Sequence, residues 1–169
     1  MSNRIVRRGL VAVSLLVALA LPAATLAATL EGTPGNDKLV GTAEADTIHG
    51  LAGRDVITGL AGNDMLYGDA GADRIRGGKG ADRIYGGIGP DRLYGGGGRD
   101  RIRGGGGADT IFGGAGRDRI AGGPGNDVIT VGYDNTADYV SCGAGRDVVI
   151  VGPTDAVTTD CERVVRVAS

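Results

Sequence analysis

The chain has 169 residues, which is room for one domain, and 34 of them are Gly, while Trp is absent and Phe occurs once. This composition excludes an ordinary core built around aromatic side chains, and the regular spacing of the glycines argues against simple disorder. The formal net charge is −2, so the overall charge gives no reason to expect a specific nucleic-acid partner.

Residues 1–27 are predicted to be a secretory signal peptide. Arg4, Arg7 and Arg8 precede an apolar run from Leu10 to Leu21, which is too short to span a bilayer comfortably. Residues 25–27 then fit a cleavage site with small residues. An uncleaved anchor helix and a twin-arginine signal are the alternatives. We expect the mature chain to begin near residue 28, to be secreted or held at the cell surface, and to have no transmembrane span.

Residues 32–130 consist of eleven consecutive copies of one nine-residue phrase, with no insertion or deletion. Numbered from Gly32, position one is Gly, position six is Asp and position eight is Ile or Leu in every copy. Position four is Gly in all copies but one, where Glu44 replaces it. The repeated aspartates are Asp37, Asp46, Asp55, Asp64, Asp73, Asp82, Asp91, Asp100, Asp109, Asp118 and Asp127.

The phrase predicts an all-β solenoid. Positions seven to nine alternate polar, apolar and polar, which is typical of a short half-buried strand with position eight pointing inward. The glycine-rich remainder is expected to form a turn. One such unit cannot bury its single Ile or Leu alone, so units must stack, with two units in each coil of eighteen residues. Equivalent positions of successive coils then lie about 4.8 Å apart.

Stacking places the aspartates in two columns, one of six members and one of five. Carboxylates repeated at about 5 Å repel one another, and a divalent cation between them turns repulsion into coordination. Carboxylate and carbonyl oxygens suit calcium, whereas magnesium demands tighter octahedral geometry. The columns offer at most nine such gaps. Because each unit buries only one large side chain against the entropy of ordering the chain, we expect the calcium-free chain to be disordered or collapsed and to fold on binding calcium.

Over 99 residues the phrase resembles the hemolysin-type, or RTX, nonapeptide G-G-x-G-x-D-x-U-x, where U is a large apolar residue. The resemblance implies a right-handed parallel β-roll in which aspartates of successive coils share calcium and carbonyls of positions one to four complete the shell. It makes all eleven repeated aspartates expected ligands. The turn from Gly41 to Asp46 is expected to bind least well because of Glu44, and the half from Gly77 to Thr130 to bind best.

The outward positions seven and nine are rich in arginine and aromatic residues. One interpretation is a solvated face that offsets the aspartate charge. The other is a surface that binds an anionic polymer, such as a cell-wall polymer, once calcium is bound. The residues concerned are Arg74, Arg83, Arg92, Arg101 and Arg119 at position seven, and Arg76, Arg103, Tyr67, Tyr85, Tyr94 and Phe112 at position nine.

After Thr130 the phrase loosens, and residues 131–169 are expected to form degenerate repeats and a C-terminal cap. Cys142 and Cys161, the two cysteines of the chain, are nineteen residues apart, close to one coil. Stacked corners about 5 Å apart suit disulfide geometry, and an exported protein favours a disulfide over the alternative of free thiols.

The sequence does not predict an enzyme. His49, the one histidine, falls at an outward position, and Ser141 has no histidine in phase with it. We expect a signal peptide at 1–27, a calcium-binding β-roll at 28–130 and a disulfide-linked cap at 131–169. The predicted function is an exported calcium-binding β-roll with a structural or surface role. The alternative is a calcium-dependent adhesion module that binds an anionic cell-surface polymer.

Overall fold

A computed structural model describes residues 26–132 and 134–167, and in this part of the chain all regular structure is strand. The predicted signal peptide lies almost entirely outside the described residues. Among the residues that are described, no helix is long and apolar enough to cross a membrane.

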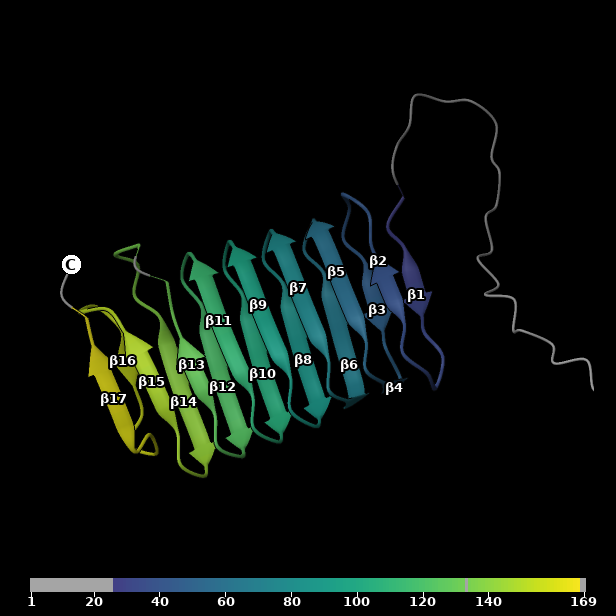
Figure 1. The fold of residues 1–169 in the computed structure, drawn as a ribbon. Coiled ribbons are helices and arrows are strands. Elements are labelled where there is room, and N and C mark those ends of the chain that lie inside the picture. The colour runs from purple at the N-terminus through teal and green to yellow at the C-terminus, as the bar shows by residue number, and fades with distance from the viewer. Residues whose placement is uncertain (1–25, 133, 168–169) are drawn as a thin grey trace, which may run out of the picture.

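The strands form two sheets, and each coil contributes one strand to each of them (Figure 1). Sheet A contains, in spatial order, β1 (Thr29–Glu31), β3 (Thr47–His49), β6 (Met65–Gly71), β8 (Arg83–Ile88), β10 (Arg101–Gly106), β12 (Arg119–Pro124), β14 (Tyr139–Ala144) and β16 (Ala156–Val157), with β4 (Ala52–Gly53) paired to β6. Sheet B contains, from the C-terminal end, β17 (Arg163–Arg166), β15 (Val148–Val151), β13 (Val128–Thr130), β11 (Thr110–Ala115), β9 (Arg92–Gly97), β7 (Arg74–Lys79), β5 (Val56–Ala61) and β2 (Lys38–Val40).

Every strand pairing is parallel, and its register follows the repeat. In sheet A, Ile84 pairs with Ile102, eighteen residues further along the chain. The two-residue insertion after β13 lengthens this spacing to twenty, so that Ile120 pairs with Val140, and the stack continues without a break. The predicted parallel solenoid of two repeats per coil is therefore confirmed.

The core consists mainly of the position-eight side chains of both sheets, which pack against one another between the sheets. From Ile48 to Ile129 each of these side chains is 0–2% exposed, and Val140 and Val149 extend the core into the tail. Leu30 and Leu39 at the first coils are only partly buried, because no further coil covers them. The prediction that position eight points inward is confirmed.

The strands are longer than the predicted triplets. β8 covers six residues, and its later part also pairs in register, with Gly87 beside Gly105. Position two has a positive φ, for example 116° at Gly87, yet its neighbours still pair with the next coil. The turn therefore contracts to positions four to six.

The backbone angle φ at position two distinguishes the first two repeats from those that follow. Leu51, Leu60 and Asp69 have φ values of 77°, 88° and 68°, which side chains with a Cβ rarely adopt. Thr33 and Thr42 at the same position of the first two copies do not have a positive φ. The first two turns therefore have a different backbone from those that follow.

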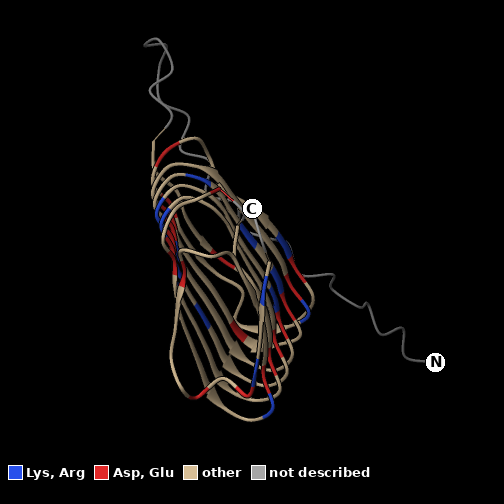
Figure 2. Cartoon of the chain, turned by 90° about the vertical axis from the view of Figure 1, so that its left-hand side faces the viewer, with Lys and Arg blue, Asp and Glu red and all other residues tan. Residues whose placement is uncertain are grey.

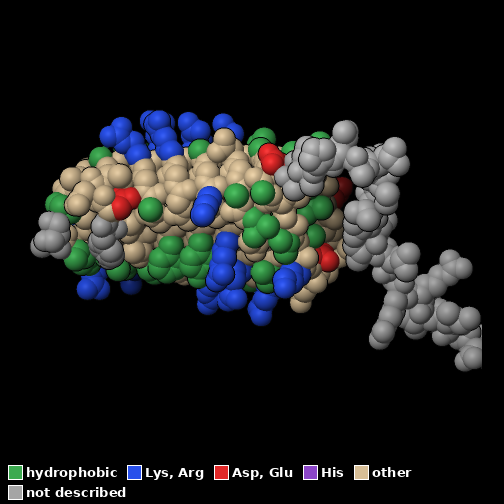
Figure 3. All heavy atoms as spheres, turned by 90° about the horizontal axis from the view of Figure 1, so that it is seen from above, with side chains coloured by type: hydrophobic (Ala, Val, Ile, Leu, Met, Phe, Trp, Pro, Cys, Tyr) green, Lys and Arg blue, Asp and Glu red, His purple; other side chains and the backbone are tan. Residues whose placement is uncertain are grey.

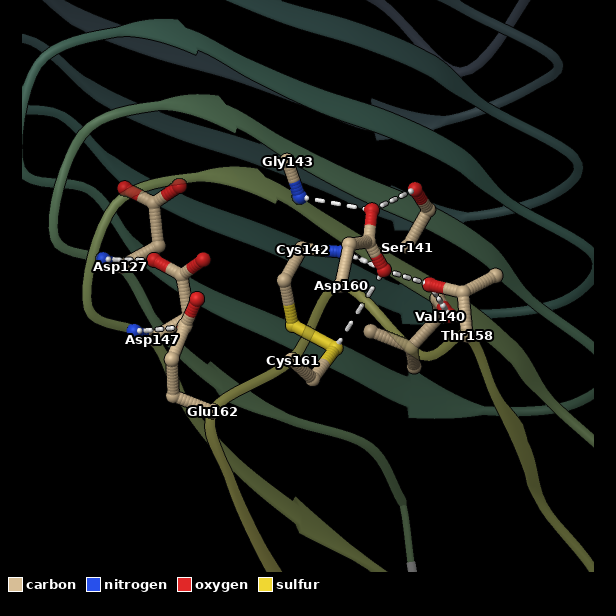
Figure 4. The surroundings of a disulfide bond; sticks show 10 residues. All are labelled: Asp127, Val140, Ser141, Cys142, Gly143, Asp147, Thr158, Asp160, Cys161 and Glu162. Atoms are coloured by element: carbon tan, nitrogen blue, oxygen red, sulfur yellow. Dashed lines mark hydrogen bonds between the residues drawn. A yellow bond between two sulfur atoms is a disulfide. The ribbon is translucent and has the colours of Figure 1, made fainter.

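The C-terminal end carries the disulfide (Figure 4). Cys142 and Cys161 are bonded, with their Cα atoms 5.2 Å apart, which confirms the predicted pairing. The Asp160 carboxylate accepts hydrogen bonds from the main-chain N–H of Gly143 at 3.0 Å and from the Ser141 hydroxyl at 3.1 Å. These bonds satisfy donors at the end of sheet A. β17 is the last strand of sheet B, and its four residues are exposed.

Candidate metal centres

The position-six aspartates form two ladders of hydrogen bonds along the solenoid. The Oδ1 atom of each accepts the main-chain N–H of the aspartate one coil earlier, as in Asp82 to Asp100 at 2.9 Å. Acidic residues accordingly line both edges of the stack in Figure 2. The first column contains Asp46, Asp64, Asp82, Asp100, Asp118, Asp138 and Asp155. The second contains Asp37, Asp55, Asp73, Asp91, Asp109, Asp127 and Asp147, and ends on Glu162.

The second carboxylate oxygen, Oδ2, is buried without a hydrogen-bond partner in most of these aspartates. An unpaired buried carboxylate oxygen is costly, and native structures leave few such groups unsatisfied. The same orphan oxygen recurs coil after coil, which points to a missing ligand. The aspartates concerned are Asp55, Asp64, Asp73, Asp82, Asp91, Asp100, Asp109, Asp118, Asp127, Asp138 and Asp147.

The glycine at position one leaves room beside this oxygen. A Cβ on Gly77 would lie 2.2 Å from Asp82 Oδ2 and 2.6 Å from the carbonyl oxygen of Gly95 in the next coil. A carboxylate oxygen and a carbonyl oxygen therefore face the same small space, and any side chain would fill it. Oxygen donors of these two kinds are the ligands that calcium prefers.

Burial raises the pKa of the carboxyl groups from Asp55 to Asp138 in this set, against hydrogen bonds from the main chain that lower it. The pKa of Asp82 and of Asp100 rises from 3.8 to about 6, and that of Asp91 and Asp118 to about 7. Neighbouring carboxylates of the same column add to the increase, as Asp109 does for Asp91. The protein surroundings by themselves thus disfavour the charged carboxylates, and a bound cation would reverse this preference.

The first two copies differ from the others. The main-chain N–H of Thr33 donates to Asp37 Oδ2 at 2.6 Å, and that of Thr42 donates to Asp46 Oδ2 at 2.5 Å. The threonine hydroxyls donate to the same carboxylates. In both aspartates Oδ2 is therefore already bonded within the turn, and in Asp46 Oδ1 also accepts the N–H of Ala28, although the sequence placed both residues with the other expected ligands.

Asp138 and Asp147 belong to the aspartates with an unpaired Oδ2, although the sequence analysis did not include them among the expected ligands. Both are 1% exposed, and their Oδ2 atoms are unpaired, as in the regular repeats. The signal was present, because each aspartate is followed by a strand in phase with the repeat once a two-residue insertion is allowed. Asp155 does not extend the set, since its Oδ2 accepts the N–H of Gly152 at 2.7 Å.

Position-five asparagines hold neighbouring turns together. The side-chain oxygen of Asn63 accepts the N–H of Ala81, and that of Asn126 accepts the N–H of Arg146. Asn36 does the same for a residue of the next coil. These side chains bond to the main chain of the following turn.

No group of three or more His, Cys, Asp or Glu side chains converges as a metal site within residues 26–132 and 134–167. A cation in one of these turns would therefore need the backbone carbonyls as well as the aspartates. His49 lies on β3, with its ring nitrogen 3.3 Å from Asp69. Ser141 lies on β14, five strands away in sheet A, so the two do not form a nucleophile and base pair.

The outward aromatic residues stack on one another along the solenoid. The rings of His49 and Tyr67 are 4.3 Å apart between centroids, and those of Tyr67 and Tyr85 are 4.9 Å apart. In sheet B, Tyr94 stacks on Phe112 at 5.0 Å. The ring faces are therefore largely covered by neighbouring rings.

A family model described as the RTX calcium-binding nonapeptide repeat matches the chain four times, at residues 31–66, 58–93, 67–102 and 94–129. Together these matches cover more than half of the chain. No curated protein matches it.

Proposed function

Because the chain belongs to the RTX calcium-binding nonapeptide repeat family, we propose that it is an exported structural protein whose solenoid folds on binding calcium. The observation that carries this proposal is the row of eleven buried aspartate oxygens without a partner. No other feature of the described residues accounts for an unpaired acceptor that recurs with the period of the repeat.

The orphan oxygens indicate which turns would hold calcium. Five belong to the first column, from Asp64 to Asp138, and six to the second, from Asp55 to Asp147, which leaves four and five gaps. We therefore still expect at most nine ions, but we place the sites nearer the C-terminus than the sequence analysis did. Asp37 and Asp46 leave the ligand set, and Asp138 and Asp147 enter it.

Each part of the repeat has a role in such a site. The aspartate offers Oδ2 while its Oδ1 is held by the ladder hydrogen bond, so the carboxylate is fixed in orientation before any ion arrives. The position-one glycine keeps the space open and brings a carbonyl oxygen to it. Calcium, when bound, would supply positive charge between carboxylates that otherwise repel one another.

Folding on calcium follows from the size of the core. One Ile or Leu per half-coil is a small apolar burial, worth about 1.5–3 kcal/mol, and it must offset the ordering of a nine-residue, glycine-rich phrase. The unpaired carboxylates oppose folding further. We expect metal binding to provide the missing free energy.

Export is the second part of the proposal. It rests on the basic and apolar pattern of residues 1–27 and on the Cys142–Cys161 disulfide, which is typical of an oxidising compartment. The β-roll at 28–130 and the cap at 131–169 would form the mature chain. The test is the N-terminal sequence of the protein recovered outside the cytoplasm, which we expect to begin near residue 28.

The calcium part is tested by circular dichroism of the purified chain during a calcium titration, with magnesium in parallel. We expect β-structure to appear with calcium and to disappear on adding chelator, and magnesium to be much less effective. Complete β-structure in chelator at neutral pH would contradict folding on calcium.

The alternative, a calcium-dependent adhesion module, is favoured by one observation. Within residues 26–132 and 134–167, no outward arginine forms a salt bridge with a carboxylate. A face of unpaired cations suits an anionic partner.

A further inference from the structure

Six arginines gather along sheet A, four on the outer face of β8, β10 and β12 and two in the turns that precede β10 and β12. We call this set the arginine patch. All six side chains are exposed, and they come from positions five, seven and nine of neighbouring coils. They are Arg83, Arg99, Arg101, Arg103, Arg117 and Arg119.

The charge of the patch is not compensated on the surface. None of its guanidinium groups forms an ion pair within residues 26–132 and 134–167. The aspartates that directly precede three of these arginines in the chain, Asp82, Asp100 and Asp118, are at most 1% exposed and belong to the hydrogen-bonded aspartate columns. Figure 3 shows Lys and Arg gathered along the two long margins of the molecule, with few acidic side chains exposed. The patch therefore projects a positive potential into solvent.

Three shallow hollows meet within the patch. One of about 220 Å³ is lined by Arg101, Arg103 and Arg119. Another of about 220 Å³ is lined by Arg99, Arg117 and Arg119 together with the buried Asp118 and Asp138. The third lies between Arg119 and Tyr139. The first hollow offers three guanidinium groups and no carboxylate to an anionic group, and guanidinium groups bind carboxylate and sulfate through paired N–H donors.

The arginines repeat along the solenoid. Arg83, Arg101 and Arg119 are direct neighbours in register, so their side chains recur at the strand spacing of about 4.8 Å. A linear polymer with one acidic group per sugar ring has a similar repeat. The phosphates of one nucleic-acid strand advance about 3.4 Å per nucleotide, which fits less well.

The properties of this face make single-stranded nucleic acid and a membrane surface less suitable partners. Single-stranded nucleic acid binds through bases stacked on open aromatic rings, but Tyr67 and Tyr85 stack on each other. A membrane surface needs an apolar face, but among β8, β10 and β12 only Ile88 is an exposed aliphatic side chain.

We propose that the arginine patch binds a linear acidic polysaccharide, carboxylated or sulfated, along the solenoid axis. This inference rests on the proposed function, because calcium is what keeps the coils, and so the arginines, in register. It restricts the partner to one face and one chemical class.

The test compares two matched double variants of the full chain. Arg101→Gln with Arg119→Gln removes two register-paired guanidiniums of the patch. Arg74→Gln with Arg92→Gln removes an equivalent pair at the same repeat position of sheet B, where one hollow of about 340 Å³ is also lined by arginine. Both changes alter the net charge equally, so a difference between them reports the location of the site.

Binding is measured by calorimetry in calcium at about 0.15 M salt, with short oligogalacturonates, which carry one carboxylate per sugar ring, as the carboxylated probe and heparin oligosaccharides as the sulfated probe. We expect the sheet A variant to lose at least about tenfold in affinity for the bound polymer, and the sheet B variant to lose less than about twofold. The probe that binds identifies the acidic group.

Several results would overturn the proposal: no binding of either oligosaccharide, equal losses in both variants, or tighter binding to DNA or to anionic phosphatidylglycerol vesicles. Circular dichroism of each sample separates the two hypotheses. A chain that folds with calcium but binds no oligosaccharide rejects the patch alone, whereas a chain that is fully folded in chelator rejects folding on calcium.

Discussion

The main-chain N–H of Thr42 donates to Asp46 Oδ2 at 2.5 Å, and this bond fills the position that is left open in the turns that follow. The Thr42 hydroxyl donates to the same carboxylate. At Asp64, one coil later in the same column, Oδ2 is buried and unpaired. A hydrogen bond within the turn thus occupies Oδ2 of Asp46, whereas Oδ2 of Asp64 has no such bond and is available to a ligand.

The difference predicts unequal effects of two identical substitutions. Asp100→Asn should remove calcium from the gaps on both sides of Asp100, because the amide replaces a charged ligand. Asp46→Asn should leave the number of bound ions unchanged, because both oxygens of Asp46 already have partners in the protein. Calcium stoichiometry by equilibrium dialysis distinguishes them, and equal losses would reject this assignment of sites.

Alanine substitutions at two glycines of the same strand, Gly95 and Gly97, should differ in their effect on stability. In Gly95→Ala the new methyl group would lie 2.3 Å from the carbonyl oxygen of Gly113 and 2.5 Å from Asp100 Oδ2. We expect it to lower the free energy of unfolding by about 1–3 kcal/mol and to weaken calcium binding. Gly97→Ala is the control, since nothing lies within 4 Å of its added Cβ. Thermal unfolding in saturating calcium measures both, and similar losses would show that the turn is not as tight as described.

Leu60→Gly should stabilise the protein. Leu60 has a φ of 88° and its side chain is 47% exposed, so the change relieves backbone strain at little cost in burial. We expect a gain of about 1 kcal/mol. Thr58→Gly in the same strand, where φ is not positive, should instead lose about 0.5–1 kcal/mol. Chemical unfolding in calcium provides the comparison, and a loss in both variants would contradict the strain.

The raised pKa values predict an unusual pH dependence for the calcium-free protein. Burial raises the pKa of Asp91 and Asp118 from 3.8 to about 7, and that of several other ladder aspartates to about 6. The folded state therefore holds protons that the unfolded chain releases near pH 4. The stability contributed by these groups is complete below pH of about 4 and is lost as the pH rises through about 6–7.

In chelator, circular dichroism should therefore show more β-structure at pH of about 4 than at pH of about 8. With calcium the order should reverse, because protons compete with the ion for the same carboxylates. Acid unfolding in chelator would contradict the expected sign.

The disulfide predicts a further dependence. Cys142 and Cys161 close a loop with a sequence separation of 19, and reduction should lower the free energy of unfolding by about 3 kcal/mol in saturating calcium. A double variant, Cys142→Ala with Cys161→Ala, should match the reduced protein and be insensitive to reductant. Equal unfolding of the oxidised and reduced protein would show that the cap is held by the Asp160 hydrogen bonds alone.

The repeat made most of the fold predictable. An apolar residue at every position eight can be buried only when the coils stack. The continuous core from Ile48 to Ile129 therefore follows from the nine-residue period of the sequence. The two aspartate columns follow as well, because the coil has eighteen residues. The longer strands did not follow, since their later half contains glycines whose pairing depends on the φ of position two rather than on side-chain pattern.

The sequence predicted that aspartates would line the turns, but not which of them keep an unpaired oxygen. By itself the sequence determined a calcium-binding repeat solenoid, because its period fixes which side chains stack. Only the tertiary structure decided that Thr42 closes one turn, that Asp147 belongs with the open ones, and that Tyr85 turns its ring face to a neighbour. The physical reason is that an open oxygen or a covered ring depends on contacts between coils and on backbone angles, which a one-dimensional pattern of residue types does not contain.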